Sequence, residues 1–181
     1  TTNVPTKSVA DLAGQKIRVM TNKYHIAYWN AIGASAVPMQ FNELFMGLQQ
    51  GTIDGQENPY MNIVGNNVQE VQKYVVETNH LGHIITFYMN KDLYGSLPEN
   101  VKTLVDECAA AATKYGNSKA DESIKGYKKT CEDAGCQIIT LDDSVLAELR
   151  EKAEPVYEMV REDLGDEIVN QLFDAINAAK Q

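Results

Sequence analysis

Residues 98–134 carry a helical pattern long enough to limit the shapes open to the chain. Apolar side chains recur there at mostly helical spacing, with Gly116 and Gly126 as weak points: Val101, Leu104, Val105, Cys108, Ala112, Tyr115, Ile124, Tyr127 and Cys131. A helix of about 35 residues is about 50 Å long. A single lobe of this size is narrower than that. We therefore predict one very long helix, straight or kinked, that runs past or between lobes.

Before this helix, strands and helices alternate with short connections. We predict a strand over residues 15–20, a helix over 24–32 that stops at Gly33, a strand over 36–39 and a helix over 43–50. Asn42 is placed to cap the last helix, and Gly51 to end it. This rhythm favours an α/β fold with a mostly parallel sheet, in which ligands bind beyond the carboxyl ends of the strands.

The remaining elements divide the chain into four parts. A helix begins at Asn58-Pro59 and runs through residue 71, and strands are expected over residues 74–78, 83–89 and 136–140. A helix from Asp142 or Asp143 to residue 164 is interrupted near Pro155, and a last helix covers residues 166–179. We expect an α/β ligand-binding core at 1–80, a crossover strand and turn at 81–97, the long helix at 98–134, and a C-terminal strand and helices at 135–181.

Composition excludes several function classes. The formal net charge of −9 disfavours nucleic acid and anionic lipid as partners. No apolar run reaches the length of about 18 residues that a membrane-spanning helix needs. The odd number of cysteines, three, does not suit a disulfide framework, and their spacing does not match a zinc motif. Cys131 and Cys136, on either side of Gly135, are close enough in sequence to form a disulfide. The sequence leaves open whether they pair or stay reduced.

Arg18 is the first candidate ligand-binding residue. It is the only arginine in the first 149 residues, and strand alternation places it opposite Ile17 and Val19, on the side of a half-exposed strand away from the local core. Its planar guanidinium suits bidentate recognition of a carboxylate, whereas the ordinary interpretation is a weak surface salt bridge.

Other polar and aromatic residues admit two interpretations each. Asn58 either caps a helix or contacts a ligand. Most aromatic residues of the chain are expected in the core, and Phe41, beside a strand end, is the best candidate for an aromatic residue that contacts a ligand instead. His80 and His83 do not share a face of an extended segment, so a metal site is not expected. Phosphate-loop, dinucleotide-binding and nucleophile-elbow motifs are absent from the sequence.

Several ordered blocks resemble the substrate-binding proteins of tripartite ATP-independent periplasmic (TRAP) transporters, the DctP-type family. In chain order they are GQKIRVM, GASAVPMQF, LQQGTIDGQENP, EVQKYVVETNH and NKDLYGSLPENV. The resemblance covers nearly the whole chain from Asp11 but begins well inside the family pattern. It implies a periplasmic binding protein-like lobe with a mixed sheet, a long bracing helix and C-terminal helices, in a fragment that lacks most of the first lobe.

The resemblance also implies roles for five residues. Arg18 matches the arginine that binds the ligand carboxylate, Asn58 a ligand-binding asparagine, and Phe41 an aromatic residue lining the pocket. Thr21 and Asn22 fall where the family places polar or small residues. Many members have proline at the position of Met20 and some have asparagine at that of Thr21, and these departures bear on substrate identity.

The implied function is capture of a small organic acid, such as a C4-dicarboxylate or sugar acid, and its delivery to a TRAP membrane permease. No catalysis, cofactor or metal is expected, and the location is periplasmic or extracytoplasmic, with a lipoprotein anchor in a host without an outer membrane. Because the opposing lobe is missing, we expect weak or absent binding by this chain alone.

Two alternatives belong to other functional classes. Apolar faces left by a missing lobe would favour a self-associating fragment, such as a homodimer, without ligand binding of its own. An enzyme on a binding-protein fold would need a titratable pair near the pocket, for which Asp54, Glu57 and His80 are the candidates.

Overall fold

Five short strands form the centre of the lobe in the computed structural model, which describes residues 1–179. The strands are β1 (Lys16–Val19), β2 (Ser35–Pro38), β3 (Gly55–Gln56), β4 (Tyr74–Glu77) and β5 (Gln137–Thr140). They pair in parallel, in the orders β2-β1-β3 and β4-β5. Thr2 joins the two groups by antiparallel bridges to Gly55 and Tyr74, so the arrangement is mixed, as expected.

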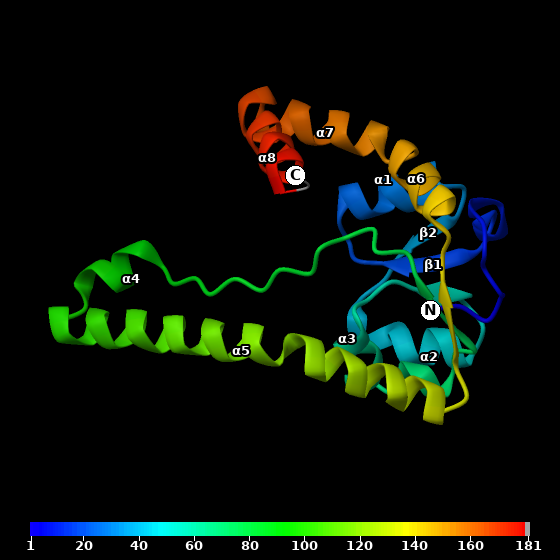
Figure 1. Cartoon of the computed structure of the whole chain (residues 1–181), viewed down its shortest axis with the longest axis horizontal. Helices are drawn as coiled ribbons and strands as arrows, with labels where there is room; N and C mark the ends of the chain where they lie inside the picture. The colour runs from blue at the N-terminus through cyan, green and yellow to red at the C-terminus, as the bar shows by residue number, and fades with distance from the viewer. Residues whose placement is uncertain (180–181) are drawn as a thin grey trace.

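Helices flank these strands and extend beyond them (Figure 1). Three short 3₁₀ turns are η1 (Val9–Leu12), η2 (Phe41–Glu43) and η3 (Val68–Glu70). The α-helices are α1 (Lys23–Ala31), α2 (Leu44–Gln49), α3 (Tyr60–Gly65), α4 (Lys91–Ser96), α5 (Glu99–Asp133), α6 (Asp143–Glu151), α7 (Glu154–Leu164) and α8 (Asp166–Ala179). Among the described residues no helix is long and apolar enough to cross a membrane.

Two hydrophobic cores cover the strands, because a parallel sheet needs both of its faces buried. The first packs strand β1 against η1, α1 and α6 through Val9, Leu12, Ile17, Val19, Trp29, Ile32, Leu141 and Leu149. The second packs α2, α3 and the end of α5 against β4 through Leu44, Leu48, Ile53, Ile63, Val68, Val75, Cys131 and Cys136. The face of β1 opposite Ile17 and Val19 is also covered, because Arg18 is 3% exposed, so the prediction that this strand is half exposed is wrong.

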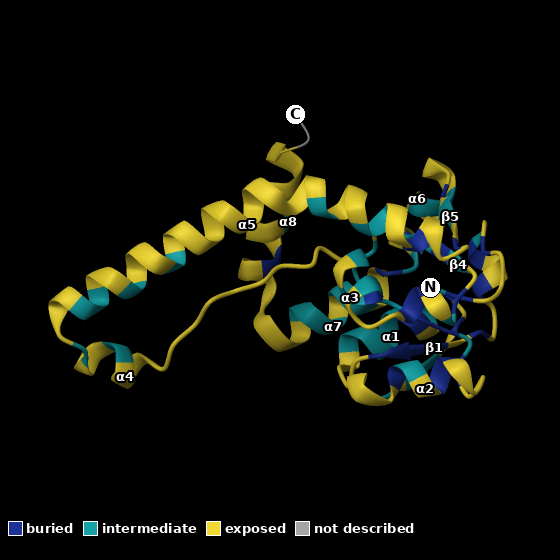
Figure 2. Ribbon diagram, turned by 90° about the horizontal axis from the view of Figure 1, so that it is seen from below, coloured by how far each residue is buried: buried dark blue, intermediate teal, exposed yellow. Residues whose placement is uncertain are grey.

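Helix α5 confirms the prediction of one very long helix. It is a single element of 35 residues, and Gly116 and Gly126 do not end it. Its C-terminal part packs against α3 and β5, while residues 110–122 are exposed throughout. Helix α4 lies against the far end of α5, where the Tyr94 hydroxyl donates to Asp106 at 2.8 Å. Figure 2 shows this exposed half projecting beyond the buried strands.

The predicted strand over residues 83–89 is not formed. Residues 81–89 are extended and exposed, but they pair with no strand in the described part of the chain. Their β-branched and aromatic side chains favour a strand, yet a strand requires a neighbour to bond its backbone. Ile84 and Tyr88 are 83% and 93% exposed.

Helix starts and stops are predicted with mixed success. Gly33, Gly51 and Gly165 follow helices with φ values of 93°, 70° and 86°, as C-terminal glycines do. Asn42 and Asn58 do not cap: α2 is preceded by the 3₁₀ turn η2, and α3 begins after Pro59 and ends at Gly65 rather than at residue 71.

The C-terminal region follows the prediction closely. Strand β5 leads into helices α6 and α7, which are separated at residues 152–153 and have Pro155 in the first turn of α7. Cys131 and Cys136 are buried, unpaired thiols in the second core, and the Cys136 thiol donates to the Gln72 carbonyl at 3.2 Å. The pairing left open by the sequence is not formed.

Candidate functional site

The candidate site lies at the carboxyl ends of β1, β2 and β3. Parallel pairing of Arg18 with Val37 and Gln56 brings these three ends to one edge of the sheet. The residues that follow the strands are Met20, Thr21 and Asn22 after β1, Met39 to Phe41 after β2, and Glu57 and Asn58 after β3. Such an edge is where open α/β sheets bind ligands.

Arg18 is buried, at 3% exposure, rather than on a half-exposed face. Its Nε donates to the Met39 carbonyl at 2.9 Å, and its guanidinium carbon lies 5.5 Å from the centre of the Phe41 ring. Burial lowers the pKa of Arg18, and the Glu57 carboxylate acts in the opposite direction. Arginine remains charged in spite of such a shift, so the edge carries a fixed positive group.

The guanidinium has no carboxylate partner within the described chain. No ion pair joins Arg18 to any acidic side chain of residues 1–179, and Nε makes its one protein hydrogen bond there. The terminal nitrogens, which form the fork that binds carboxylates, are unused. These nitrogens remain in reach of solvent, so the fork is open to an anion supplied from outside the described residues.

Thr21 and Asn22, which follow Met20, differ in the hydrogen bonding of their side chains. Asn22 caps α1, and its Oδ1 accepts from the Tyr24 and His25 amides at 2.9 and 3.4 Å. Its side-chain oxygen therefore has a structural role that the sequence analysis did not assign. Thr21 is exposed, and its hydroxyl makes no hydrogen bond with the described residues.

Asn58 is oriented by neighbouring amides. Its Nδ2 donates to Gln56 Oε1 at 2.6 Å, and its Oδ1 accepts from Asn62 Nδ2 at 2.9 Å. Because an amide has two N–H groups and two lone pairs on oxygen, one of each remains available. Asn58 is thus held in a fixed orientation without exhausting its bonding capacity.

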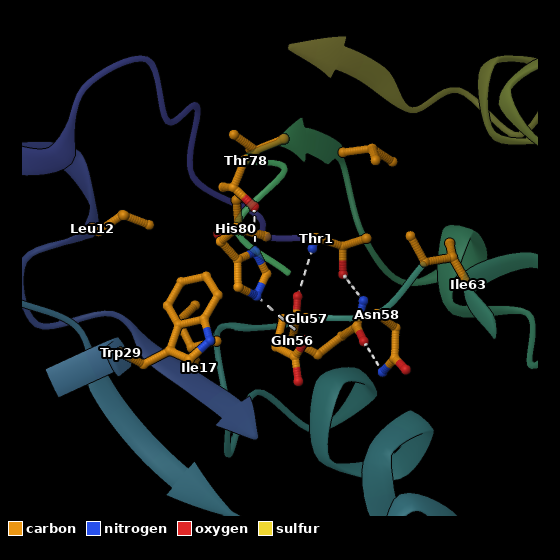
Figure 3. Close-up of a pocket in the computed structure, with 13 residues that line it drawn as sticks. Thr1, Leu12, Ile17, Trp29, Gln56, Glu57, Asn58, Ile63, Thr78 and His80 are labelled. Carbon is orange, nitrogen blue, oxygen red and sulfur yellow. Dashed lines mark hydrogen bonds and ion pairs between the residues drawn. The ribbon is translucent and has the colours of Figure 1, made fainter. Parts of the chain in front are cut away.

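A small cavity lies beside this edge and is drawn in Figure 3. Gln56, Glu57, Asn58, Trp29 and His80 are among its lining residues, whereas Arg18 and Phe41 do not line it. Its volume is about 60 Å³, far below the several hundred cubic ångströms of a typical ligand pocket. An organic acid cannot be enclosed there by the described residues alone.

A buried carboxylate between two imidazoles stands next to the cavity. Glu57 Oε1 lies 3.2 Å from His25 Nδ1, and Glu57 Oε2 lies 3.5 Å from His80 Nε2. The Thr78 hydroxyl is 2.7 Å from His80 Nδ1, and the Tyr28 ring stacks on His80 at 5.3 Å. Burial by itself would raise the pKa of Glu57, but the two imidazoles outweigh it and lower the pKa to about 2.

This Glu57 cluster was only partly visible in the sequence. Glu57 and His80 were candidates for a titratable pair, but His25 was not connected to them, because 32 residues separate it from Glu57. No local motif signals a contact made by three different elements. Asp54, the third candidate, accepts from the Lys16 amide at 2.7 Å and has a structural role. No group of three or more His, Cys, Asp or Glu side chains among residues 1–179 is placed to hold a metal ion, and the Glu57 cluster is no exception.

Comparison with known proteins decides the family. The profile described as "Bacterial extracellular solute-binding protein, family 7" (DctP) matches residues 1–163. The chain belongs to this family. DctP proteins are the solute-binding proteins of transporters and not enzymes, in agreement with the expectation drawn from the sequence blocks.

Similar proteins share both sequence and fold with the chain. The C4-dicarboxylate-binding periplasmic protein DctP of Rhodobacter capsulatus is 32% identical over 179 residues, which are 98% of this chain and 52% of that protein. A TRAP periplasmic solute-binding protein from Desulfovibrio salexigens, crystallised with orotic acid, is 30% identical and has a TM-score of 0.86, over 99% of this chain and 58% of its own.

A third comparison connects the same fold to a different ligand. A TRAP periplasmic solute-binding protein from Roseobacter denitrificans, crystallised with L-galactonate, is 35% identical with a TM-score of 0.84, over 96% of this chain and 57% of its own. The chain spans about half the length of the curated relatives it matches. Its fold is the α/β fold of the TRAP solute-binding proteins.

Proposed function

We propose that this chain forms the Arg18-bearing lobe of a periplasmic receptor that binds a small organic acid and delivers it to a TRAP membrane permease. The observation that carries the proposal is the buried Arg18 guanidinium, whose terminal nitrogens have no carboxylate partner in the described residues. A ligand carboxylate would provide that partner in a bidentate geometry. The acids named for its relatives, C4-dicarboxylate and L-galactonate among them, all fit this chemistry.

The neighbouring residues take supporting roles in this proposal. The unused N–H of Asn58 donates to the same carboxylate, while Thr21 and Asn22 border the ligand and Phe41 covers it. Closure on a ligand that bridges two lobes would be a population shift, which the permease detects. In this scheme residues 1–80 are the ligand-binding core, 81–97 the crossover and α5 the brace between lobes.

The test compares the 181-residue chain with a protein extended to the full length of its relatives. Thermal shifts are measured against succinate, uronates, aldonates, sialic acid and aromatic acids. A ligand at about 100 times its Kd stabilises the native state by about 2.7 kcal/mol. We expect a selective shift in the extended protein and little or none in the 181-residue chain.

Variants of Arg18 test whether this residue binds the ligand carboxylate. Arg18→Gln should abolish the shift, and Arg18→Lys should weaken it because an ammonium lacks the fork. Arg150→Gln, which alters an exposed arginine on α6, is the matched control and should leave it unchanged. A shift that survives Arg18→Gln, or no shift with any acid, would contradict the proposal.

A second candidate function rests on the exposed apolar segment 81–89. Leu81, Ile84, Ile85, Phe87 and Tyr88 are all more than half exposed, and the backbone of this segment has no strand partner in the described chain. Such a strip favours pairing with another chain, so we propose that the 181-residue chain forms homodimers through it. Light scattering should then show a mass that rises with concentration, and Ile84→Asp with Phe87→Asp should return it to that of a monomer.

The proposed receptor function also implies a cellular location for the protein. The relatives are described as periplasmic, and we propose an extracytoplasmic location for this protein, with a lipoprotein anchor if its host has no outer membrane. Fractionation of cells that express the chain extended to the full length of its relatives tests this, with labelling by palmitate for the anchored form. Recovery from the cytoplasm would contradict the assignment.

A further inference from the structure

We propose that Cys131 and Cys136 form a disulfide bond when a disulfide-bearing oxidant reacts with the chain, and that this bond fastens the C-terminal end of α5 to β5. The structure shows the pair in its reduced form, with both thiols buried in the second core. Only the supply of the oxidant rests on the proposed function, because an extracytoplasmic compartment is an oxidising one. The capacity of the two thiols to pair depends on the fold alone.

The end of α5 brings the two cysteines together. The Cys136 amide donates to the Cys131 carbonyl, and the Gly135 amide donates to the Glu132 carbonyl, both at 2.9 Å. Gly135 has a φ of 92°, so these two bonds form a Schellman motif, which ends a helix at a residue with positive φ. In this motif the first and the last of the six residues frequently contact one another through their side chains. Here those residues are Cys131 and Cys136.

The same hydrogen bond limits the distance between the two backbones. A carbonyl oxygen lies about 2.4 Å from its own Cα, and an amide nitrogen about 1.5 Å from its own. With 2.9 Å between the Cys136 nitrogen and the Cys131 oxygen, the two Cα atoms are at most about 6.8 Å apart. Disulfide-bonded residues usually have Cα atoms about 4.4–6.8 Å apart. The bond can therefore form while the helix end keeps its hydrogen bonds.

Burial determines when the pair reacts. Cys131 is 0% exposed and Cys136 is 5% exposed. Burial, with a smaller contribution from the neighbouring Cys136 thiol, raises the pKa of Cys131 to about 11. The thiolate is the attacking species in disulfide exchange, so the folded chain should react slowly. We expect the bond to form during folding, before the second core closes over the two thiols.

The reaction consists of two exchanges with one oxidant disulfide. The thiolate of one cysteine attacks that disulfide, which forms a mixed disulfide and releases one thiol; the second cysteine then attacks the mixed disulfide and releases the other thiol. Two electrons and two protons pass from the pair to the oxidant. The weak hydrogen bond from the Cys136 thiol to the Gln72 carbonyl, at 3.2 Å, is lost. In return, the closed six-residue loop restricts the unfolded chain.

The test uses Cys108→Ser, which removes the exposed thiol of α5 and leaves only the pair to react. The 181-residue chain is unfolded, reduced and refolded with glutathione disulfide, and its remaining thiols are then alkylated in denaturant and counted by mass spectrometry. We expect no alkylated thiol in the refolded monomer, and alkylation of both cysteines after reduction. Free thiols, glutathione adducts on the two cysteines or a disulfide-linked dimer would each overturn the proposal.

Thermal denaturation tests whether the bond fastens the end of α5. The Tm of Cys108→Ser should be higher by about 5 °C in the oxidised form than in the reduced form. The matched control adds Cys131→Ala, which leaves Cys136 without a partner, and its Tm should not respond to the oxidant. No difference in Tm, or an equal difference in the control, would overturn the fastening role. Ligand binding is not measured in this experiment, so failure of the acid screen would contradict the proposed function and leave the disulfide standing.

Discussion

The Glu57 cluster predicts a specific acid sensitivity of the fold. Glu57 is 10% exposed in its side chain and lies between His25 and His80. Its pKa is about 2 in the folded chain, against an ordinary value of 4.5. A carboxylate whose pKa is lowered by folding stabilises the fold at every pH above its unfolded value, and this contribution is lost as the pH falls through the folded value.

The magnitude follows from the two pKa values. A gap of about 2.5 pH units corresponds to about 3 kcal/mol, because each unit is worth about 1.4 kcal/mol. The wild-type chain should therefore lose about 3 kcal/mol between pH 5 and pH 2 through this one group. The side chain of glutamine does not titrate in this range. The free energy of unfolding of Glu57→Gln should therefore fall by about 3 kcal/mol less than that of the wild type between pH 5 and pH 2.

Urea titrations at several pH values measure the difference. Trp29, the single tryptophan, is buried 5.2 Å from His80 and provides a fluorescence signal next to the cluster. Glu70→Gln, at an exposed carboxylate, is the control and should follow the wild type. Parallel pH profiles for wild type and Glu57→Gln would refute the lowered pKa of Glu57 in the folded chain.

Three further stability predictions can be checked by urea denaturation of the same chain. Arg18→Met should lower the stability of the ligand-free chain by about 1 kcal/mol, because the bond to the Met39 carbonyl is lost while the terminal nitrogens are open to solvent; a clear gain in stability would contradict that description of Arg18. Leu44→Ala should cost about 3 kcal/mol, since Leu44 is 1% exposed in the second core, and an unchanged midpoint would exclude it from that core. Gly55→Ala should cost at least about 2 kcal/mol, because its Cβ would collide with the Thr1 carbonyl, and a neutral result would contradict the close approach at that point.

Local signals in the sequence predicted most elements of the fold. Glycines after helices, the period of about 3.6 in residues 98–134 and the alternation in residues 15–20 each act within a few residues, so they can be interpreted without knowing the rest of the structure. The same locality explains the error at residues 83–89. Their composition suits a strand, but strand formation depends on a partner that composition does not reveal.

The site was predicted in part for a related reason. Arg18 was recognised from its isolation in the sequence and from the family blocks, whereas its burial depends on cover from residues that follow it by 20 or more positions. The contacts of His25 and His80 with Glu57 join three elements that have no common motif. The capping role of Asn22 was accessible from sequence, because asparagine before a helix is a common N-cap.

Helix α5 has a mechanical consequence that follows from its attachment at one end. Cys131 is fully buried and Lys128 pairs with Glu77, so the C-terminal turns are fixed to the lobe. The preceding stretch, residues 99–122, forms an arm about 36 Å long. A rotation of about 10° at its base would move the far end, with α4, by about 6 Å, given that length. Small angular changes near β4 and α3 are thereby amplified into large displacements at the tip, as in a lever.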